Sequence, residues 1–256
     1  MVKALKEAWS SRHGGFLCHY TGVKLDDNDS HSPWYLTFDH RTPHTKGDLV
    51  VAAFAINVMK SELSEDEFVK FIKHAAEHFA GKPFNREIIP FDSWTRNPGP
   101  KPKPLKAGKD HGKGGYSREC VVCGGVALLH SMCCARCRGF ALTNKYKEIK
   151  ARRVALKLAW SKKDNGFLCY YSGMVLEEKE TRSPWYLTFD HRVPKDKATI
   201  VVSSFIFNVM KTDTTEVEFK AFVKELARHW NRSLPFRKKK VEFTLWHRVI
   251  RPKKRK

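Results

Sequence analysis

The spacing of apolar residues in the first part of the chain predicts short helices and strands. Helical spacing predicts a helix over residues 2–11, and the apolar run at 16–20 predicts a strand closed by a Thr-Gly turn. Alternation over residues 34–39 predicts a second strand. From residue 48 to 59 the apolar spacing is helical again, so we expect a helix after this strand.

A further helix is expected directly afterwards, because Ser64 and Glu67 have the spacing of a capping box. Thr215 and Glu218 have the same spacing later in the chain. Between them, residues 144–163 predict a charged helix. These elements together predict an α+β protein.

Two blocks of sequence occur twice. Trp-Tyr-Leu-Thr-Phe-Asp-His-Arg begins at residue 34 and again at residue 185, and Asn-Val-Met-Lys begins at 57 and again at 208. The separation is 151 residues in both cases. An ungapped repeat over this distance predicts two copies of one small folding unit.

The charge of the chain narrows its partners. Lys and Arg number 48 against 27 Asp and Glu, a formal net charge of +21. Such an excess repels itself unless a polyanion neutralises it, so nucleic acid is the expected partner. A basic surface that serves only solubility is the plainer alternative, and an anionic membrane is less favoured because no basic amphipathic anchor stands out.

Long apolar segments are missing from the sequence. No run of about 18 apolar residues occurs, and the N-terminal residues do not have the apolar core of a signal peptide. We therefore expect no membrane partner and a cytoplasmic or nucleoid-associated protein, nuclear if eukaryotic.

The cysteines are unevenly spread, and most lie between residues 120 and 137. Two C-x2-C pairs separated by ten residues predict a structural zinc site with four thiolate ligands: Cys120, Cys123, Cys134 and Cys137. The C-x2-C spacing favours Cys134 over its neighbour Cys133 as a ligand. The alternative is a buried cluster of free thiols.

The repeat, the cysteines and the basic stretches divide the chain into five parts. In order, we predict a first repeat at 1–89, a basic Pro- and Gly-rich linker at 90–117, a zinc-binding module at 118–150, a second repeat at 151–236 and a basic tail at 237–256. The tail contains a strand-like apolar run at 241–246.

The end of the strand predicted at 34–39 carries the candidate chemistry. Asp39 offers a hard oxygen ligand for a divalent cation, and His40 is suited to act as a general base near neutral pH. Neighbours on a strand point to opposite faces, so joint use of both at one site requires a bend after Phe38. Asn57 offers an amide oxygen as a second metal ligand, and Lys60 on the same helix face could reach a phosphate.

An alternative is a hydrogen-bonded Asp-His pair that only orders a turn. Against it, both copies keep Asp, His, Asn and Lys although they differ at many other positions. The second set, in the same roles, is Asp190, His191, Asn208 and Lys211.

A strand ending in Asp-His, followed by a turn and a helix with Asn and a Lys three residues later, resembles the HNH, or ββα-metal, nuclease superfamily. It is most like the Asp-His…Asn subgroup, and the resemblance covers residues 16–62 and 167–213. It implies that Asp39 and Asn57, like Asp190 and Asn208, hold one divalent metal, Mg²⁺ or Mn²⁺. It also implies that the histidine of each copy is the general base.

The resemblance has several departures, among them a middle motif position that falls near Asp48 and Thr199 and does not match. Many family members hold the motif with C-x2-C zinc knuckles, whereas each copy here has one cysteine, Cys18 or Cys169. We therefore expect apolar packing to hold the helix of each copy.

We predict from these features a metal-dependent endonuclease with one active site per repeat, which cuts both strands of DNA as a monomer that mimics a dimer. A restriction or homing type is expected. The alternative is a non-catalytic, zinc-stabilised nucleic-acid-binding protein built on degenerate nuclease repeats. Basic residues beside each Asp-His pair, in the linker and in the tail are expected to contact nucleic acid: Arg41, Arg192, Lys101, Lys103, Lys253, Lys254 and Arg255.

Overall fold

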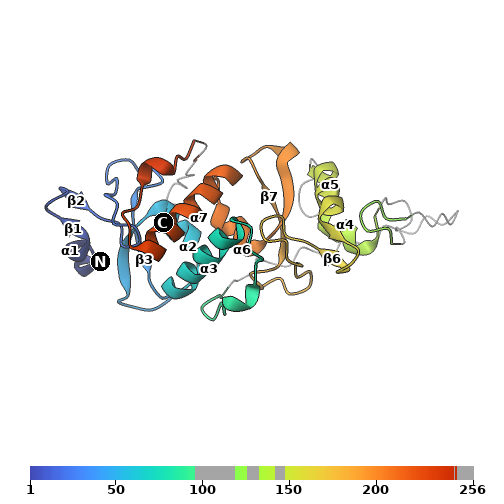
Figure 1. Ribbon diagram of the computed structural model, residues 1–256, viewed down its shortest axis with the longest axis horizontal. Helices are drawn as coiled ribbons and strands as arrows, with labels where there is room; N and C mark the ends of the chain where they lie inside the picture. Colours follow the sequence, from blue (N-terminus) through green and yellow to red (C-terminus); the bar gives the residue numbers. More distant parts are fainter. Residues whose placement is uncertain (96–118, 126–132, 142–147, 245, 247–256) are drawn as a thin grey trace, which may run out of the picture. The chain divides into compact units, whose positions relative to one another are not determined.

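A computed structural model of the protein describes residues 1–95, 119–125, 133–141, 148–244 and 246 (Figure 1). Over these residues it is a mixed α+β protein whose sheets are small, antiparallel and two-stranded. The chain divides into two compact units, Met1–Thr95 with Val209–Lys256, and Arg96–Asn208. No helix in the described part of the chain has the length and apolar character needed to cross a membrane.

The first unit contains one pair of very short strands, one β-hairpin and the helices packed on it. In chain order its elements are α1 (Val2–Ala8), β1 (Trp9–Ser10), β2 (Gly15–Phe16), β3 (Leu36–His40), β4 (Leu49–Ala53), α2 (Phe54–Lys60), α3 (Glu65–His78) and η1 (Arg86–Ile88), then α7 (Glu216–Arg232) and η4 (Lys238–Lys240). Helices α1 and α2 both contact β4.

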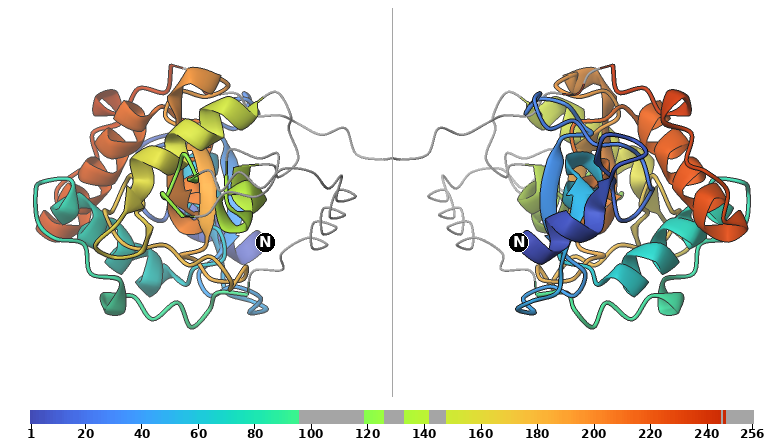
Figure 2. Two further views of the ribbon diagram at one scale, coloured as in Figure 1. Left: turned by 90° about the vertical axis from the view of Figure 1, so that its right-hand side faces the viewer. Right: turned by 90° about the vertical axis from the view of Figure 1, so that its left-hand side faces the viewer.

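The second unit has elements that correspond to those from α1 to α2 in the same order, and two without a counterpart among the described residues, its first helix and its 3-10 helix. They are α4 (Ala135–Ala141), α5 (Ile149–Ala159), β5 (Trp160–Ser161), β6 (Gly166–Phe167), β7 (Leu187–His191), η3 (Lys197–Thr199) and β8 (Ile200–Ser204), followed by α6 (Phe205–Lys211), which runs across the boundary between the units. Helix α5 crosses the β7–β8 sheet and contacts β8 (Figure 2).

The helix predicted at 48–59 is wrong in its first part, which forms strand β4. Residues 49–53 instead pair with β3, with Asp39 opposite Val50 and His40 opposite Leu49, and the helix begins only at Phe54. A short apolar run fits a buried strand as well as a helix, and the partner strand decides between them. The pairing of β7 with β8 has the same register 151 positions later.

Strand β3 stays paired through His40, so the bend expected after Phe38 does not occur. The strand predicted at 16–20 is also shorter than expected. Only Gly15–Phe16 forms a strand, and Leu17 adds an isolated bridge to Lys24.

Helices α3 and α7 begin as the sequence predicts. The capping boxes at Ser64 and Thr215 are both present, each with a side-chain oxygen that accepts the backbone N–H three residues on. The two helices lie side by side and antiparallel (Figure 1). Phe68 near the start of α3 meets Trp230 near the end of α7, with ring centroids 5.6 Å apart.

The segment after α7 closes the core of the first unit. The rings of Phe236 and Phe243 lie 5.7 and 5.9 Å from the buried ring of Trp34. Val241 is buried, and Glu218 accepts hydrogen bonds from the backbone and the hydroxyl of Thr244. Residues 241–244 and 246 form no strand, so this part of the predicted tail packs as irregular chain.

Candidate functional site

The carboxylate of Asp39 lies inside the first unit rather than on its surface. Asp39 is 6% exposed and accepts a hydrogen bond of 2.5 Å from the hydroxyl of Tyr20. The ammonium of Lys60 lies 3.2 Å from the same carboxylate and donates a hydrogen bond of 2.7 Å to the carbonyl of His40. Burial and the Asp39 carboxylate raise the pKa of Tyr20, so the phenol remains a donor.

The amide of Asn57 ties helix α2 to strand β3. Its Nδ2 donates hydrogen bonds of 3.2 Å to the hydroxyl of Thr37 and 2.9 Å to the carbonyl of Phe38. Thr37 and Asp39 lie on the same face of β3, because side chains two apart on a strand point the same way. Asn57 Oδ1 makes no hydrogen bond to the described residues, so it could serve as a ligand.

Cys18 has a structural role in the first repeat. Its buried sulfur accepts the backbone N–H of Ala53, at 3.4 Å, where β4 passes into α2. Burial raises the pKa of this thiol, which keeps it neutral. The single cysteine thus holds the start of α2 by a hydrogen bond within an apolar core, a contact that the sequence analysis did not predict.

His40 is partly exposed and held in one orientation. Its Nδ1 lies 2.9 Å from the carbonyl of Thr45, so Nδ1 carries the hydrogen and donates it. Nε2 is then the unprotonated nitrogen of the neutral ring. This tautomer is the one that a general base requires at Nε2.

Lys60 lies elsewhere than its predicted role requires. The side chain is fully buried and faces Asp39, whereas contact with a substrate phosphate needs an accessible ammonium. Burial lowers the pKa of Lys60, and the Asp39 carboxylate partly offsets this effect. In this structure Lys60 compensates the charge of Asp39.

The second repeat builds the same inner contacts 151 residues later. The hydroxyl of Tyr171 donates a hydrogen bond of 2.6 Å to Asp190, which is 5% exposed. Asn208 Nδ2 donates 3.1 Å to the carbonyl of Phe189. The sulfur of Cys169 accepts a backbone N–H at 3.4 Å. His191 is partly exposed, and Lys211 is buried.

The surroundings of the two histidines differ. In the first repeat, Arg41 donates to Glu65 at 2.5 Å, and His19 lies 3.0 Å from the other oxygen of Glu65. In the second, Arg192 lies over the ring of Tyr170 and donates 3.2 Å to its hydroxyl. Tyr170 occupies the position that corresponds to His19, so the arginine beside each histidine is held by a different group.

Each repeat has a pocket between its first helix and its β-hairpin. In the first repeat it measures about 290 Å³ and includes His19 and Glu7 in its lining. In the second it measures about 550 Å³ and has Tyr170 and Leu158 at those positions. The second pocket is therefore larger and more apolar.

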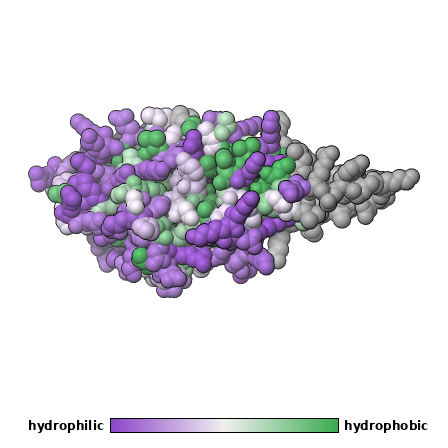
Figure 3. All heavy atoms as spheres, turned by 45° about the vertical axis from the view of Figure 1, so that its right-hand side comes forward, coloured by the Kyte–Doolittle hydropathy of each residue, from purple (hydrophilic) through white to green (hydrophobic). Residues whose placement is uncertain are grey.

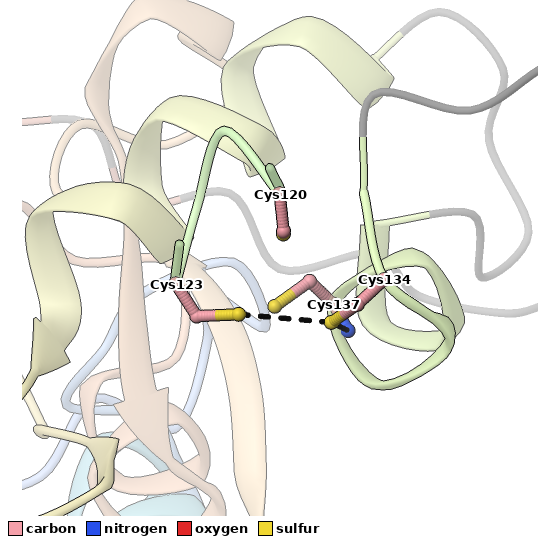
Figure 4. Close-up of side chains that lie close together, drawn as sticks. All are labelled: Cys120, Cys123, Cys134 and Cys137. Carbon is pink, nitrogen blue, oxygen red and sulfur yellow. Dashed lines mark hydrogen bonds between the residues drawn. The ribbon is translucent and has the colours of Figure 1, made fainter. Parts of the chain in front are cut away.

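The four predicted zinc ligands converge as the spacing predicts. The sulfurs of Cys120, Cys123, Cys134 and Cys137 lie within 4.8 Å of one another (Figure 4). The first two come from a loop that turns at Gly124, and the other two from the start of α4. This cluster could hold a structural metal ion, and Cys133 is not part of it.

The thiols of this cluster need a cation to ionise together. Burial opposes ionisation of Cys120, but backbone N–H groups of Cys123 and Cys134 lower its pKa to about 6. Burial and the neighbouring thiols raise the pKa of Cys137. A divalent metal supplies the positive charge that four adjacent thiolates require.

Arg136 on α4 fixes this helix within the second unit. Its guanidinium donates to the carboxylate of Glu178 and, at 3.0 Å, to the carbonyl of Asn165. It also lies 4.8 Å from the ring centre of Trp160.

The remaining predicted contacts are basic. Arg41 and Arg192 lie beside the histidines, while Lys101, Lys103, Lys253, Lys254 and Arg255 fall outside the described residues. The face in Figure 3 is largely hydrophilic, with one larger group of apolar side chains and several smaller ones.

The sequence analysis does not predict the role of Tyr20 and Tyr171. Both are tyrosines at corresponding positions of the repeat, and this identity is the signal that could have pointed to them. No protein-family model matches the chain, and no curated protein or solved structure matches it either.

Proposed function

We propose that the protein is a metal-dependent endonuclease of the HNH type, with one site in each repeat, acting on double-stranded DNA. One observation carries the proposal: each repeat combines a buried aspartate clamped by a tyrosine hydroxyl, a partly exposed histidine beside it, and an asparagine tied to the same strand. The formal net charge of +21 supports a polyanionic substrate.

His40 is the base in this proposal, which requires the end of β3 to bend so that Asp39 and His40 can face one phosphate. With Nδ1–H held by the carbonyl of Thr45, Nε2 accepts a proton from water as it attacks the phosphorus. The same carbonyl then stabilises the imidazolium, because Nδ1 continues to donate to it. His191 takes this role in the second repeat.

Asp39 and Asn57 are the residues that would hold a divalent cation, as would Asp190 and Asn208. The donor set fits in type, since carboxylate and amide oxygens on one face suit a hard cation such as Mg²⁺. Such a cation supplies positive charge to the phosphate and to the leaving oxygen. In the first repeat the ammonium of Lys60 already neutralises Asp39, so a cation that binds Asp39 would have to displace part of this contact.

The Lys60 contact favours a second candidate function. A carboxylate that is paired with an ammonium and a phenol, and is 6% exposed, also suits a purely structural role. The protein would then bind nucleic acid without cutting it.

Plasmid cleavage separates the two functions. Supercoiled plasmid is incubated with the protein in Mg²⁺ or EDTA, and the cut ends are mapped. The nuclease predicts Mg²⁺-dependent cleavage that the double variant His40→Ala/His191→Ala loses. Binding in a gel-shift assay with no cleavage by the wild type supports the second candidate.

A matched control uses the other pair of repeated histidines. His78 and His229 are also 151 residues apart, and each lies within hydrogen-bond reach of a carbonyl after its helix. The variant His78→Ala/His229→Ala should keep cleavage, because neither ring belongs to the sites. Equal loss in both double variants contradicts the proposed role of His40 and His191.

The cysteine cluster is proposed to bind one structural zinc, because four thiolates without an open position suit zinc and stabilise a fold. Metal analysis of the purified protein should find one zinc per chain in the wild type and in Cys133→Ser. Cys134→Ser should lose it, since of these two adjacent cysteines only Cys134 belongs to the cluster. Equal zinc in all three proteins overturns this assignment.

A further inference from the structure

Trp230 of helix α7 reaches the residue that holds Asp39. Its indole Nε1 donates a hydrogen bond of 3.0 Å to the backbone carbonyl of Tyr20, 210 residues earlier in the chain. The indole ring also meets Phe68 at 5.6 Å, and Phe68 in turn packs against the ring of Tyr20 at 6.1 Å. A direct hydrogen bond and an indirect ring contact through Phe68 of α3 thus link Trp230 to Tyr20.

Tyr20 passes this restraint to the candidate site. Its ring is 3% exposed, and its hydroxyl donates 2.5 Å to Asp39. A shift of the Tyr20 backbone moves the phenol relative to the carboxylate, because the side chain is packed on all sides. The position of Asp39 in the first repeat therefore depends on a residue from the sequence of the second.

The restraint has no chemical equivalent at the corresponding position of the first repeat. Phe79 stands 151 residues before Trp230, and its ring meets Phe219 at 6.0 Å as Trp230 meets Phe68. A phenylalanine ring has no N–H group, so this position cannot supply the hydrogen bond that Trp230 donates.

We infer that Trp230 is a positioning residue for the first site and not for the second. Its test by DNA cleavage rests on the proposed nuclease function. The position of Asp39, in contrast, can be measured whether or not the protein cuts DNA. The expected consequence is an asymmetry: the rate of the first site depends on the Trp230 hydrogen bond, and the rate of the second does not.

Single-site backgrounds test this asymmetry. His191→Ala leaves only the first site active, and His40→Ala leaves only the second. Trp230→Phe, which keeps an aromatic ring and removes the N–H, is added to each. We expect nicking to fall about three- to tenfold in the His191→Ala background, the scale of one lost hydrogen bond, and to be unchanged in the His40→Ala background. Phe79→Leu, at the corresponding position of α3, should not reproduce this pattern.

The result that overturns the inference is an equal fall in both backgrounds, which indicates general destabilisation, or no fall in either. Carboxyl ¹³C resonances give a second reading. Trp230→Phe should shift the resonance of Asp39 and leave that of Asp190 in place. If neither background cuts DNA but the Asp39 resonance shifts, the positioning role stands and the proposed function fails; an unshifted resonance removes the positioning role.

Discussion

In the first repeat Arg41 is paired with Glu65, whereas in the second Arg192 lies against Tyr170. Beneath these arginines the two repeats agree: a tyrosine hydroxyl donates to the aspartate, an asparagine donates to the strand, and a cysteine sulfur accepts a backbone N–H. The inner contacts are buried and the outer ones are exposed. The two sites therefore share their inner hydrogen bonds and differ in the charge that they present to a ligand.

The largest expected effect tests whether both sites are active. His40→Ala and His191→Ala should each remove one cut and convert double-strand cleavage into nicking, with a loss of about 10²- to 10⁴-fold at the altered site. Strand-resolved mapping of the nick identifies the remaining site. Linear plasmid from either variant at the wild-type rate contradicts the assignment of one strand to each repeat.

A large effect on stability is expected at the buried ion pair of the first repeat. Asp39→Ala leaves the fully buried Lys60 without its carboxylate, which should cost about 3–5 kcal/mol in the free energy of unfolding. Urea denaturation measures it. Asp66→Ala on the exposed face of α3 is the control and should change stability by less than about 0.5 kcal/mol. Similar costs for both variants rule out a buried pair.

Acid should distinguish two side chains at corresponding positions of the repeats, His74 and Glu225, each of which anchors a later segment by accepting a backbone N–H. His74 Nε2 accepts the N–H of Asn85 at 2.6 Å, and Glu225 accepts the N–H of Arg237 at 2.8 Å. Burial lowers the pKa of His74. Burial alone would raise the pKa of Glu225, but hydrogen bonds from Arg228 and Arg237 lower it to about 2.

The sign is the same for both anchors, and the pH window differs. Each folded pKa lies below its unfolded value, so each contribution is complete above the unfolded pKa and is lost as pH falls through the folded one. The unfolded values are about 6.5 for histidine and about 4.3 for glutamate. As pH falls from 7, the His74 anchor should therefore begin to weaken at about pH 6.5, whereas the Glu225 anchor should hold until below about pH 4.3.

Amide hydrogen exchange at Asn85 and Arg237, corrected for the intrinsic pH dependence, measures this difference. His74→Gln keeps an acceptor that does not titrate, so Asn85 should then lose its pH response. Parallel loss of protection at both amides in the wild type contradicts the separate windows.

The smallest effect concerns the arginines themselves. Glu65→Gln releases Arg41, whose side chain is 50% exposed, and should tighten DNA binding by less than about 1 kcal/mol. Glu216→Gln removes the same charge beside Lys220 instead and is the matched control. Titration at several salt concentrations should give a larger gain for Glu65→Gln. Identical gains indicate that only net charge matters.

The sequence predicted features that depend on local spacing. The capping boxes at Ser64 and Thr215 and the convergence of the four cysteines needed only residues close in the chain. The β4 strand was read as a helix, because the apolar run at 49–53 carries no period that separates the two and its partner lies on another segment.

The sequence predicts which residues form the candidate site better than it predicts their burial and contacts. Asp39 and His40 lie at the end of β3 and Asn57 lies on α2, where the sequence pattern predicts the end of a strand and a helix. The burial of Lys60 and the contact of Tyr20 with Asp39 depend on packing between distant segments, so spacing along the chain could not reveal them.

The antiparallel pairing of α3 and α7 has a consequence for biosynthesis. Phe68 has to wait for Trp230 to leave the ribosome, 162 residues later, before its aromatic partner on α7 exists. At about 5–20 residues per second this takes on the order of ten seconds. During that interval the nascent first repeat lacks helix α7, so the face of α3 that carries Phe68 stays uncovered, which favours binding by a chaperone.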